Sequence, residues 1–376
     1  MSSARESGLI RVGFDDQIFE AQHRGGISKY YVELMRRLPD HGIEPVLLAR
    51  STRNKHLAES GLVPARAEPG KLRDKVEWAS WRLTGHPRTM PRRLPSIDIM
   101  HHTFSHPAYL RRWRGPRVVT VYDMTPEVYP GLFPLGNPHF AKRRYCEAAD
   151  AIIAISQGTA DDVARFYGSQ IGERIDVVPL AVGEAFFAPG VAPAGLPERY
   201  LLYVGVRSGY KDFSVALAAF AEVAAEDPQV AFVVVGGGQF TDEELRAIEE
   251  TGLADRILPL APSDAELPEI YRLAAALVFP SRYEGFGLPT LEALAEGTPV
   301  ILADASCSRE VGGAVASYFT PGDAGELALR IREALAPDVS TRVRTDGPAW
   351  ARTFAWDRVA SQTAAIYRRL ARTSVR

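Results

Sequence analysis

The sequence predicts an α/β protein with two doubly wound domains, each built on a parallel β-sheet that helices cover on both faces. Short apolar runs, each of strand length, alternate with segments of helical periodicity along most of the chain. These runs are continuously apolar rather than alternating, which is typical of strands that are buried on both faces. The chain has 376 residues, enough for two domains of about 150 residues each.

Six strands are expected in the first half, where β-branched and other apolar residues cluster. They cover Ile10–Phe14, Pro45–Ala49, Ile97–His101, Val118–Tyr122, Ala151–Ile155 and Ile175–Pro179. Apolar residues at helical spacing predict helices over 27–38, 137–149 and 158–167. Gly25-Gly26 precedes the first of these helices and leaves the amide groups at its start accessible.

The second half repeats this alternation. Its strands are expected over Tyr200–Val206, Ala231–Val235, Ile257–Leu260, Ala276–Phe279, Pro299–Leu302 and Ser317–Phe319. Its helices are expected over 212–225, 241–251, 265–274, 289–295 and 324–336. Asp212 is positioned to cap the first of them. A last helix is expected over 350–370, with apolar spacing at Phe354, Val359, Thr363 and Ile366.

The boundary between the domains is expected at residues 183–199, where neither period is visible. Proline and glycine are dense in Phe-Phe-Ala-Pro-Gly-Val-Ala-Pro-Ala-Gly-Leu-Pro, which marks a linker. We therefore expect one domain over 1–182, a second over 200–350 and a C-terminal helix within 351–376. Two such domains would face a central cleft at the carboxyl ends of both sheets, where ligands usually bind.

Charge is distributed unevenly between the two halves. Residues 1–180 hold 26 Lys/Arg and 20 Asp/Glu, a charge of +6, whereas residues 181–376 hold 18 and 26, a charge of −8; together they give the net −2. All eight histidines fall in the first half. The domains are therefore expected to have different partners. Neither half is basic enough to predict a nucleic-acid partner, and no motif that reads RNA or DNA is present.

Several classes of protein are excluded by composition. No uncharged apolar run reaches the ~18 residues that a membrane-spanning helix needs, and no secretory signal is visible at the start. Cys146 and Cys307 form no metal-type pair, which is typical of proteins in a reducing compartment. We therefore expect a cytoplasmic protein.

The segment from Phe279 to Val300 is the most informative. A buried strand ends near Pro280, a glycine-rich turn follows, and Pro289 stands where the first turn of a helix tolerates proline. The amides of 286–288 would then lie beside a positive helix end that suits an anionic or polyhydroxyl ligand. Glu284 and Glu292, eight residues apart, could bind hydroxyl groups at two ends of one elongated ligand.

A lone glutamate is more simply a helix cap or a surface residue, and the surrounding Gly-Phe-Gly-Leu-Pro sequence is what favours a ligand-binding role here.

A second group of candidate residues lies in the segment Leu201-Leu-Tyr-Val-Gly-Val-Arg-Ser-Gly-Tyr-Lys-Asp-Phe213. Arg207 and Lys211 lie between a strand and a helix, where two cations beside backbone amides suit a diphosphate. Alone, this loop would be interpreted as an ordinary solvated turn.

Other catalytic motifs are missing from the sequence. It contains no Asp-x-Asp, His-Glu-x-x-His, Walker-type or Gly-x-Ser-x-Gly pattern. Metal-dependent transfer, nucleotide hydrolysis and serine hydrolysis therefore lack support. We expect no metal site and no cofactor.

The two groups of candidate residues, in this order and separation, resemble the family-4 retaining glycosyltransferases of the GT-B fold. That family pairs an Arg/Lys loop with a Glu-x7-Glu element in its second domain. Weaker similarities extend over nearly the whole chain, in Gly25-Gly26-Ile-Ser-Lys-Tyr30, Ala154-Ile-Ser156, Val178-Pro179, Val235-Gly-Gly-Gly238 and Phe354-Ala-Trp356. The last of these resembles the start of a closing helix that packs back on the first domain.

The resemblance implies a role for each matched residue. Catalytic work falls to Glu284 on the donor sugar and to Arg207 and Lys211 on the diphosphate. Donor binding falls to the amides of Phe286, Gly287 and Leu288, to Glu292 on the ribose, to Gly25 and Gly26 on the phosphate, and to backbone around Leu260–Pro262 on the base. The first domain is then the acceptor side, and the second binds the nucleotide sugar.

One departure concerns the acceptor. Where the family often has His-Asp after a first-domain strand, this chain has Tyr122-Asp123. We expect His101 and His102, at the end of the preceding strand, to take that place together with Asp123. For an isolated histidine, a hydrogen-bonded core or surface role is the usual alternative.

These observations, together with the resemblance, predict a metal-independent hexosyltransferase that moves a sugar from a nucleotide-diphosphate sugar to a glycan or lipid-linked hydroxyl. Retention of configuration is implied by the resemblance alone. The loop from Val206 to Phe213 resembles that of mannosyltransferases of polysaccharide biosynthesis, so GDP-mannose is the expected donor. A nucleotide-sugar epimerase of the same fold and a non-catalytic nucleotide-sugar-binding protein are the alternatives. Release of nucleoside diphosphate, epimerised sugar or neither would distinguish the three.

An arginine cluster suggests where the acceptor lies. Eight arginines and one acid, Asp98, fall between residues 82 and 117, beside Trp78, Trp81 and Trp113; the arginines are 82, 88, 92, 93, 111, 112, 114 and 117. Arginine near tryptophan suits peripheral contact with an anionic membrane. An ordinary solvated arginine-rich face is the alternative.

Overall fold

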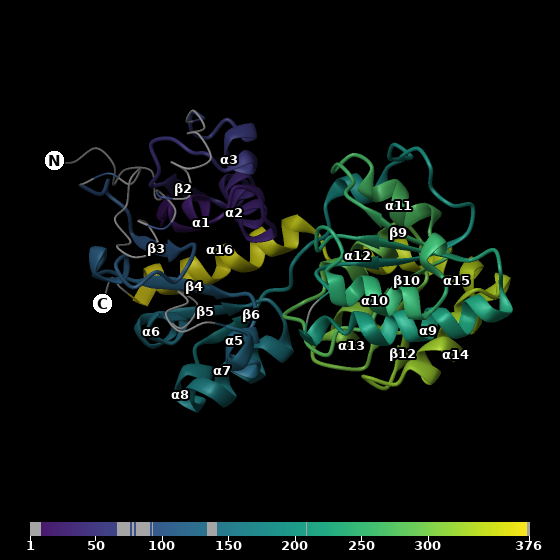
Figure 1. Ribbon diagram of the computed structural model, residues 1–376. Helices are drawn as coiled ribbons and strands as arrows, with labels where there is room; N and C mark the ends of the chain where they lie inside the picture. The colour runs from purple at the N-terminus through teal and green to yellow at the C-terminus, as the bar shows by residue number, and fades with distance from the viewer. Residues whose placement is uncertain are drawn as a thin grey trace. The chain divides into compact units, whose positions relative to one another are not determined.

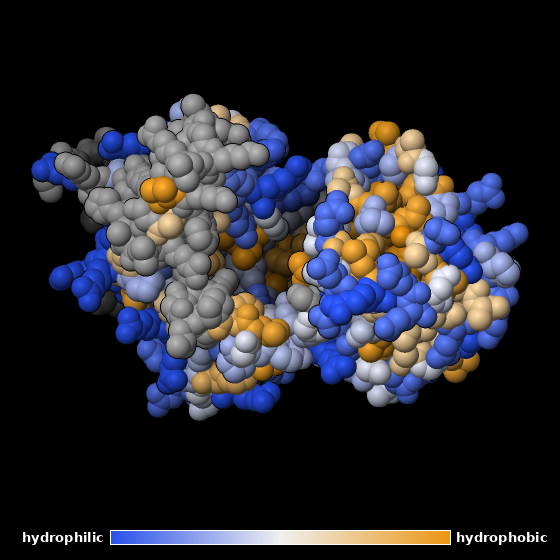
Figure 2. All heavy atoms as spheres, in the orientation of Figure 1, coloured by the Kyte–Doolittle hydropathy of each residue, from blue (hydrophilic) through white to orange (hydrophobic). Residues whose placement is uncertain are grey.

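The computed structural model describes residues 9–65, 93–133, 141–207 and 209–373, together with the single residues 76, 79 and 91 (Figure 1). The chain divides into two compact units. Unit 1 comprises Met1–Leu180 with Trp356–Arg376, and unit 2 comprises Ala181–Ala355. Each unit has its own sheet and its own apolar core. On the face of unit 2 shown in Figure 2, hydrophilic side chains lie among apolar ones.

Within the described ranges, the sheet of unit 1 has six parallel strands in the order β2-β1-β3-β4-β5-β6. Its strands are β1 (Ile10–Phe14), β2 (Ile43–Leu47), β3 (Ile99–His102), β4 (Arg117–Val121), β5 (Ala151–Ala154) and β6 (Ile175–Val177). The order reverses between β1 and β3. In an open α/β sheet, ligands bind outside the carboxyl ends of the strands at such a switch point.

Helices alternate with these strands along the chain, as expected of a doubly wound unit. They are α1 (Gln17–Ala21), α2 (Gly26–Arg37), α3 (Lys55–Glu59), α5 (Thr125–Val128), α6 (Lys142–Ala148), α7 (Gln157–Tyr167) and α8 (Ser169–Gly172). The predicted helix over 137–149 begins at Lys142, and the part of it before residue 141 lies outside the described residues. Ser156 caps α7 through its hydroxyl, which accepts from the Thr159 amide.

The sheet of unit 2 also has six parallel strands, in the order β12-β11-β10-β7-β8-β9. Its strands are β7 (Tyr200–Val204), β8 (Ala231–Val235), β9 (Ile257–Leu260), β10 (Ala276–Phe279), β11 (Val300–Ala303) and β12 (Ser317–Phe319). Here the order reverses between β7 and β10. The loops that follow these two strands contain Arg207, Lys211 and Glu284.

Among the described residues, seven helices accompany this sheet. They are α9 (Phe213–Glu226), α10 (Asp242–Glu250), α11 (Leu267–Leu273), α12 (Leu288–Ala295), α13 (Ser308–Gly312) and α14 (Ala324–Ala334), followed by α15 (Pro337–Ala351). Helices α9 and α14 lie against the sheet around a buried apolar cluster in which Phe220 stacks on Phe232, with ring centroids 5.2 Å apart. The predicted α/β fold and all twelve strands are confirmed, with ends shifted by a few residues.

The C-terminal helix α16 (Trp356–Thr373) belongs to unit 1, where it contacts α2, β1 and β3 (Figure 1). Its buried residues recur every three or four positions, and Val359, Thr363, Ile366 and Leu370 are among them. Such a stripe is what a helix needs to cover a sheet. Among the described residues, we find no helix that combines the length and apolarity required to span a bilayer.

The predicted helix over 350–370 was wrong at its start. Helix α15 ends at Ala351, and a turn over 352–355 separates it from α16. Phe354 lies in this turn and packs edge-on against Phe286 of unit 2, with ring centroids 5.9 Å apart. The sequence did not predict α15 because Gly347-Pro348 interrupts its pattern. Gly347 is needed there, since a Cβ would come 2.7 Å from the Leu294 carbonyl oxygen.

The segment expected as a linker, 183–199, lies within unit 2. The Val191 amide donates to the Ala265 carbonyl at 3.1 Å, and Gly190 approaches the Glu269 backbone so closely that a Cβ would stand 2.9 Å from its nitrogen. Phe186 packs edge-on against Tyr271. Proline and glycine density therefore reflects an irregular segment held on the unit's surface.

Candidate active site

The switch point of unit 2 brings two loops together. One follows β7 and contains Arg207 and Lys211; the other follows β10 and contains Glu284. The loops touch through their backbones, because the Arg282 amide donates to the Tyr210 carbonyl at 2.8 Å. The sequence placed these residues on separate elements, and the strand order of the sheet makes them neighbours.

Lys211 and Glu284 form an ion pair between the lysine Nζ and the glutamate Oε1. Their side chains are only 14% and 20% exposed. The ammonium also lies 5.3 Å from the ring centroid of Tyr210 and 5.7 Å from that of Phe279, within the range of a cation–π interaction. A mobile surface lysine would have no such surroundings, so this pair is a built feature of the site.

Arg207 is the most enclosed cation of the site, with a side chain 2% exposed. Its guanidinium donates to both carboxylate oxygens of Glu244, at 2.9 and 3.2 Å, and to the carbonyls of Gly236 and Gln239 at 2.6 and 2.7 Å. The ring of Phe240 lies 4.6 Å from its central carbon. Arg207 therefore fixes the glycine loop after β8 and is fixed by it.

Glu244 is itself held by the start of α10. It forms a capping box with Thr241: the Thr241 amide donates to Glu244 Oε2 at 2.7 Å, and the Glu244 amide donates to the Thr241 hydroxyl at 3.2 Å. Partial burial alone would raise the pKa of Glu244, but the hydrogen bonds from Arg207 and Thr241 outweigh it and hold the pKa below its usual value. The carboxylate thus stays ionised beside Arg207.

The backbone of the Glu284 loop is anchored by the loop after β11. The Ser306 hydroxyl donates to the Glu284 carbonyl at 2.6 Å, and the Cys307 thiol lies 3.3 Å from the same oxygen and 3.2 Å from the Phe286 carbonyl. Burial raises the pKa of Cys307 well above its usual value, so this cysteine acts as a neutral donor and not as a nucleophile.

Helix α12 begins directly after this loop. Gly287 stands at its N-cap with φ 93° and has no side chain to accept from the first amides. That left-handed backbone favours glycine, and Pro289 occupies the first turn as predicted. Glu292, one turn into the helix, accepts from the Tyr271 hydroxyl at 2.8 Å. Tyr271 is fully buried, so its hydroxyl orients the Glu292 carboxylate.

The predicted capping role of Asp212 was wrong. Asp212 occupies the N-cap position of α9 but makes no side-chain cap. Its carboxylate instead accepts two hydrogen bonds from Arg282, at 2.6 and 3.2 Å. The arginine competes successfully because a bidentate, charge-assisted pair is stronger than a single bond to a backbone amide.

In unit 1, Gly25 and Gly26 lie at the start of α2. Gly25 is the N-cap in extended conformation, and its carbonyl accepts from the Ser28 hydroxyl at 2.9 Å. Gly26 is exposed, and a Cβ on it would meet no atom of the described residues within 4 Å. The space beside Gly26 is therefore open, as the predicted approach of a ligand to this helix start requires.

The two histidines at the end of β3 differ. His101 is fully buried, with Nδ1 2.5 Å from the Tyr367 hydroxyl and Nε2 2.8 Å from the Thr120 hydroxyl. Burial lowers the pKa of His101 to about 3, so it is neutral at physiological pH. Both ring nitrogens thus have hydrogen-bond partners inside the core, and these bonds connect α16 to the sheet. His101 thus has the surroundings of a core histidine.

His102 lies at the switch point of unit 1 with Asp15, which follows β1. Its Nδ1 is 2.7 Å from Asp15 Oδ2, and both side chains are at most 2% exposed. Burial alone would raise the pKa of Asp15, but bonds from His102, Thr103 and Gln17 outweigh it and lower the pKa. The His102 Nε2 atom is buried and has no hydrogen-bond partner among the described residues.

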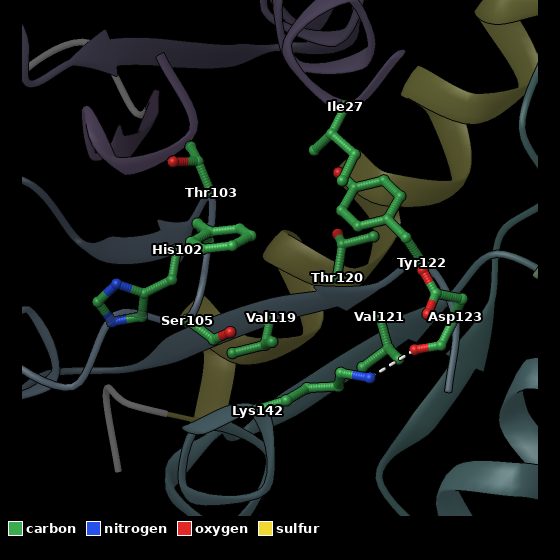
Figure 3. Close-up of a pocket in the computed structure, with 11 residues that line it drawn as sticks. Ile27, His102, Thr103, Ser105, Val119, Thr120, Val121, Tyr122, Asp123 and Lys142 are labelled. Carbon is green, nitrogen blue, oxygen red and sulfur yellow. Dashed lines mark hydrogen bonds between the residues drawn. The ribbon is translucent and has the colours of Figure 1, made fainter. Parts of the chain in front are cut away.

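A pocket of about 40 Å³ lies beside these carboxyl ends. Its lining includes Ile27, His102, Thr103, Ser105, Thr120, Tyr122, Asp123 and Lys142 (Figure 3). Figure 3 shows the imidazole of His102 directed away from Thr120 and Tyr122. The Lys142 ammonium donates to the Asp123 carbonyl at 2.6 Å and pairs with Glu127 at 2.9 Å. The Asp123 carboxylate accepts from the Thr125 amide at 2.9 Å.

Three further predictions concern a metal site, the backbone segment expected at the nucleotide base, and the arginine cluster. Within the described ranges, no group of three or more His, Cys, Asp and Glu side chains could hold a metal ion. Leu260 ends β9, and residues 261 and 262 follow it in a loop. In the arginine cluster, Arg111 and Arg114 are exposed, whereas Arg112 donates to the Pro91 carbonyl and Arg117 to that of Trp113.

Of the remaining members of that cluster, Arg93 is exposed, whereas residues 78, 81, 82, 88 and 92 lie outside the described residues. Sequence reasoning missed four side chains that support the site: Asp15, Glu244, Ser306 and Cys307. Glu244 had a detectable signal, because Thr241 and Glu244 fit a capping-box spacing. The others act through contacts between distant segments, which spacing alone cannot reveal.

Comparison with known proteins shows matches over both units. The family described as "Glycosyltransferase Family 4" matches residues 24–185, and that described as "Glycosyl transferases group 1" matches residues 191–346. A D-inositol 3-phosphate glycosyltransferase of Streptomyces bingchenggensis is 30% identical, with 91% of this chain and 84% of that protein covered. The O-antigen chain mannosyltransferase B of Escherichia coli is 25% identical, with coverage of 92% and 96%.

Among solved structures, Anabaena Alr3699/HepE in complex with UDP and glucose is similar in fold, with a TM-score of 0.69, 21% identity and coverage of 95% of this chain and 98% of that one. Two Rossmann-like units, each with a switch point, define the chain as a protein of the GT-B fold. The chain belongs to the family-4, group 1 glycosyltransferases of that fold. Its predicted family and fold class are thereby confirmed.

Proposed function

We propose that this glycosyltransferase moves a hexose from a nucleotide-diphosphate sugar to an acceptor hydroxyl, with retention of configuration and without a metal ion. The observation that carries the proposal is the Lys211–Glu284 ion pair at the switch point of unit 2. It joins a cation suited to phosphate and a carboxylate suited to a sugar at the place where ligands of such sheets bind.

The cations act on the leaving group. As the bond between the sugar carbon and the diphosphate oxygen breaks, negative charge grows on that oxygen. Lys211 stabilises this charge, and Arg207 contributes from its fixed position beside the glycine loop. Because both charges are held in place before the reaction, they need no reorganisation as it proceeds. They supply the electrostatic stabilisation that a divalent cation gives in metal-dependent enzymes.

The carboxylates act on the sugar and the nucleotide. Glu284 binds a hydroxyl of the donor sugar, with amides of Phe286, Gly287 and Leu288 beside it. Glu292, oriented by Tyr271, binds the ribose hydroxyls. Gly25 and Gly26 in unit 1 contact donor phosphate. The acceptor attacks on the face from which the diphosphate leaves, and the departing phosphate oxygen takes the proton of the acceptor hydroxyl.

The acceptor binds to unit 1 near His102 and Asp123, which line one pocket. His102, with its buried unpartnered Nε2 and its Nδ1 held by Asp15, is the better candidate of the two histidines. His101 supports the strand end from inside the core. This part of the proposal predicts that a substitution at His102 affects the KM of the acceptor, whereas one at His101 affects stability.

We favour mannose from GDP-mannose and a lipid-linked or other glycan acceptor. The name of the Escherichia coli relative, an O-antigen chain mannosyltransferase, supports this choice. A second candidate acceptor is an inositol phosphate, because the Streptomyces relative is named for that substrate. We place the enzyme in the cytoplasm, with Arg111 and Arg114 facing an anionic membrane surface.

A donor and acceptor panel tests the proposal. Purified protein is incubated in excess EDTA with GDP-mannose, UDP-glucose, UDP-N-acetylglucosamine or ADP-glucose, with and without a lipid-linked glycan or inositol 3-phosphate. Nucleoside diphosphate release is measured, and NMR gives the anomeric configuration of the product. We expect GDP release, an α-linked mannosyl product and full activity in EDTA. Epimerised donor, an inverted product or rescue by manganese alone would contradict it.

The membrane contact is tested separately by vesicle co-sedimentation. Binding to anionic phospholipid vesicles should fall as salt rises and should weaken when Arg111 and Arg114 are changed to Ser. Equal sedimentation with neutral and anionic vesicles, or with neither, would contradict the contact while leaving the reaction untouched.

A further inference from the structure

Asp212 has an unusual backbone conformation. It lies between Lys211 and helix α9 with φ 54° and ψ 40°, and among the described residues only Ser306 is another non-glycine residue with positive φ. Side chains rarely adopt this left-handed region, although aspartate tolerates it better than most. Glycine would adopt it without strain. The aspartate side chain must therefore provide something that glycine lacks.

The carboxylate of Asp212 contributes to a contact between loops. It does not cap α9; it accepts from Arg282 Nε at 2.6 Å and from Arg282 Nη2 at 3.2 Å. The Asp212 side chain is 8% exposed, and that of Arg282 is 51% exposed. A parallel two-bond contact fixes the orientation as well as the distance of its partners.

This contact lies directly beside the Lys211–Glu284 pair. Asp212 follows Lys211 in the chain, and Arg282 precedes Glu284 by two residues. The Arg282 amide also donates to the Tyr210 carbonyl at 2.8 Å. Two ion pairs and a backbone hydrogen bond thus join the loop after β7 to the loop after β10.

Stability alone explains this arrangement poorly. An ion pair whose arginine is half exposed contributes little to folding, and the left-handed conformation at Asp212 costs stability. Strain of this kind persists at functional sites, where it serves positioning. A contact that sets the position of the neighbouring ammonium accounts for both the strain and the carboxylate.

We propose that Asp212 and Arg282 are positioning residues for sugar transfer: their ion pair locks the two loops together and sets where the Lys211 ammonium lies relative to Glu284. This inference rests on the proposed function, in which Lys211 faces the diphosphate and Glu284 faces the sugar. Asp212 and Arg282 themselves touch neither.

The variant Asp212→Gly tests the proposal because it removes the ion pair and relieves the backbone strain at once. We expect its melting temperature to equal or exceed that of the wild type, whereas kcat falls about tenfold or more. Asp212→Asn keeps one acceptor oxygen, and asparagine tolerates the left-handed backbone conformation. Its kcat should therefore lie between those of the wild type and Asp212→Gly. Rates are compared well below each melting temperature, so that a loss of stability cannot imitate the effect.

A matched control lies at the other end of α9. Glu226 forms a similar two-bond pair with Arg332, at 2.8 and 2.9 Å, far along the helix from the site loops. Glu226→Gln should leave kcat unchanged. An equal loss of kcat in Glu226→Gln and Asp212→Gly would show that any α9 ion pair affects activity in this way, and would overturn the proposal.

A double-mutant cycle with Lys211→Ala separates this inference from the proposed function. If Asp212 acts through Lys211, Asp212→Gly should cost less than twofold in kcat once Lys211 is alanine. A full tenfold loss in that background, or no loss in the wild-type background, overturns the inference alone. A normal kcat in Lys211→Ala itself would overturn the proposed function.

Discussion

Lys211 and Glu284 form an ion pair at the switch point of unit 2, although 73 residues separate them in the chain. Each residue was expected to face a different part of the donor. In this pair the cation and the carboxylate satisfy each other, and both side chains are mostly buried. A donor that binds there must supply groups to replace each partner.

Replacement of Glu284 by Gln should separate binding from chemistry. The variant loses the carboxylate and leaves Lys211 free for phosphate. We therefore expect GDP affinity that is equal to or tighter than that of the wild type, and turnover that is lower by about 100-fold or more, because interactions on the reacting sugar act mainly in the transition state. Calorimetry measures the affinity for GDP, and initial rates measure turnover.

Glu250→Gln, on an exposed position of α10, is the control for that experiment and should change neither quantity. Near-normal turnover in Glu284→Gln would mean that the loop after β10 has another role.

Replacement of Glu292 by Gln should weaken nucleotide binding. Ribose contacts are the same in the ground and transition states, so their loss raises KM and leaves kcat nearly unchanged. We expect GDP affinity to fall about tenfold. Tyr271→Phe removes only the hydrogen bond that orients the carboxylate and should have a smaller effect in the same direction. A fall in kcat with unchanged GDP affinity would instead place Glu292 at the reacting sugar.

Replacement of Arg207 by Lys should loosen the glycine loop after β8. Lysine cannot make the two-bond contact with Glu244 and the carbonyl contacts at the same time. We expect donor affinity and kcat each to fall about tenfold, and Glu244→Gln to have the same effects at smaller size. Steady-state kinetics measure them.

Glu326 offers a matched control for Glu244. It lies in the first turn of α14, accepts from the Thr320 amide at 2.8 Å and pairs with Arg330. Glu326→Gln should leave the kinetics unchanged. If it lowers kcat as much as Glu244→Gln does, the effect arises from a weakened helix start and not from Arg207.

Replacement of His101 by Phe should destabilise unit 1. The hydroxyls of Tyr367 and Thr120 lose their buried partner, at a cost of about 2–6 kcal/mol for two unsatisfied groups. Denaturant unfolding at pH 7 measures this loss. A variant of unchanged stability but much lower turnover would place His101 in the chemistry.

The pH dependence of stability provides a second test of His101. The folded state keeps its pKa at about 3, against 6.5 for an ordinary histidine. Between these values the unfolded state binds the proton more readily, so this group's contribution is full above pH 6.5 and is lost as the pH falls toward 3. The stability of His101→Phe should therefore decrease less steeply over that range. Parallel curves for the variant and the wild type would contradict the assigned environment.

The sequence predicted the fold well because strand runs and helix spacing are local properties. Strands such as Ala231–Val235 and Ala276–Phe279 matched residue for residue. It failed where distant contacts override local preference. Asp212 pairs with Arg282 instead of capping α9, and Phe354 leaves the last helix to pack on Phe286. The pairing of Asp15 with His102 and that of Glu244 with Arg207 depend on sheet order and loop geometry. No local sequence pattern encodes such pairings.

The turnover of Lys211→Ala in excess EDTA tests the central claim most directly. Removal of a preorganised charge at the leaving group should cost about 3 kcal/mol of transition-state stabilisation, which lowers kcat by about 100-fold. The account predicts full wild-type activity in EDTA and this loss in the variant, with the melting temperature little changed. The account would be contradicted by a Lys211→Ala enzyme with more than half the wild-type kcat, or by a wild-type enzyme that loses its activity in EDTA.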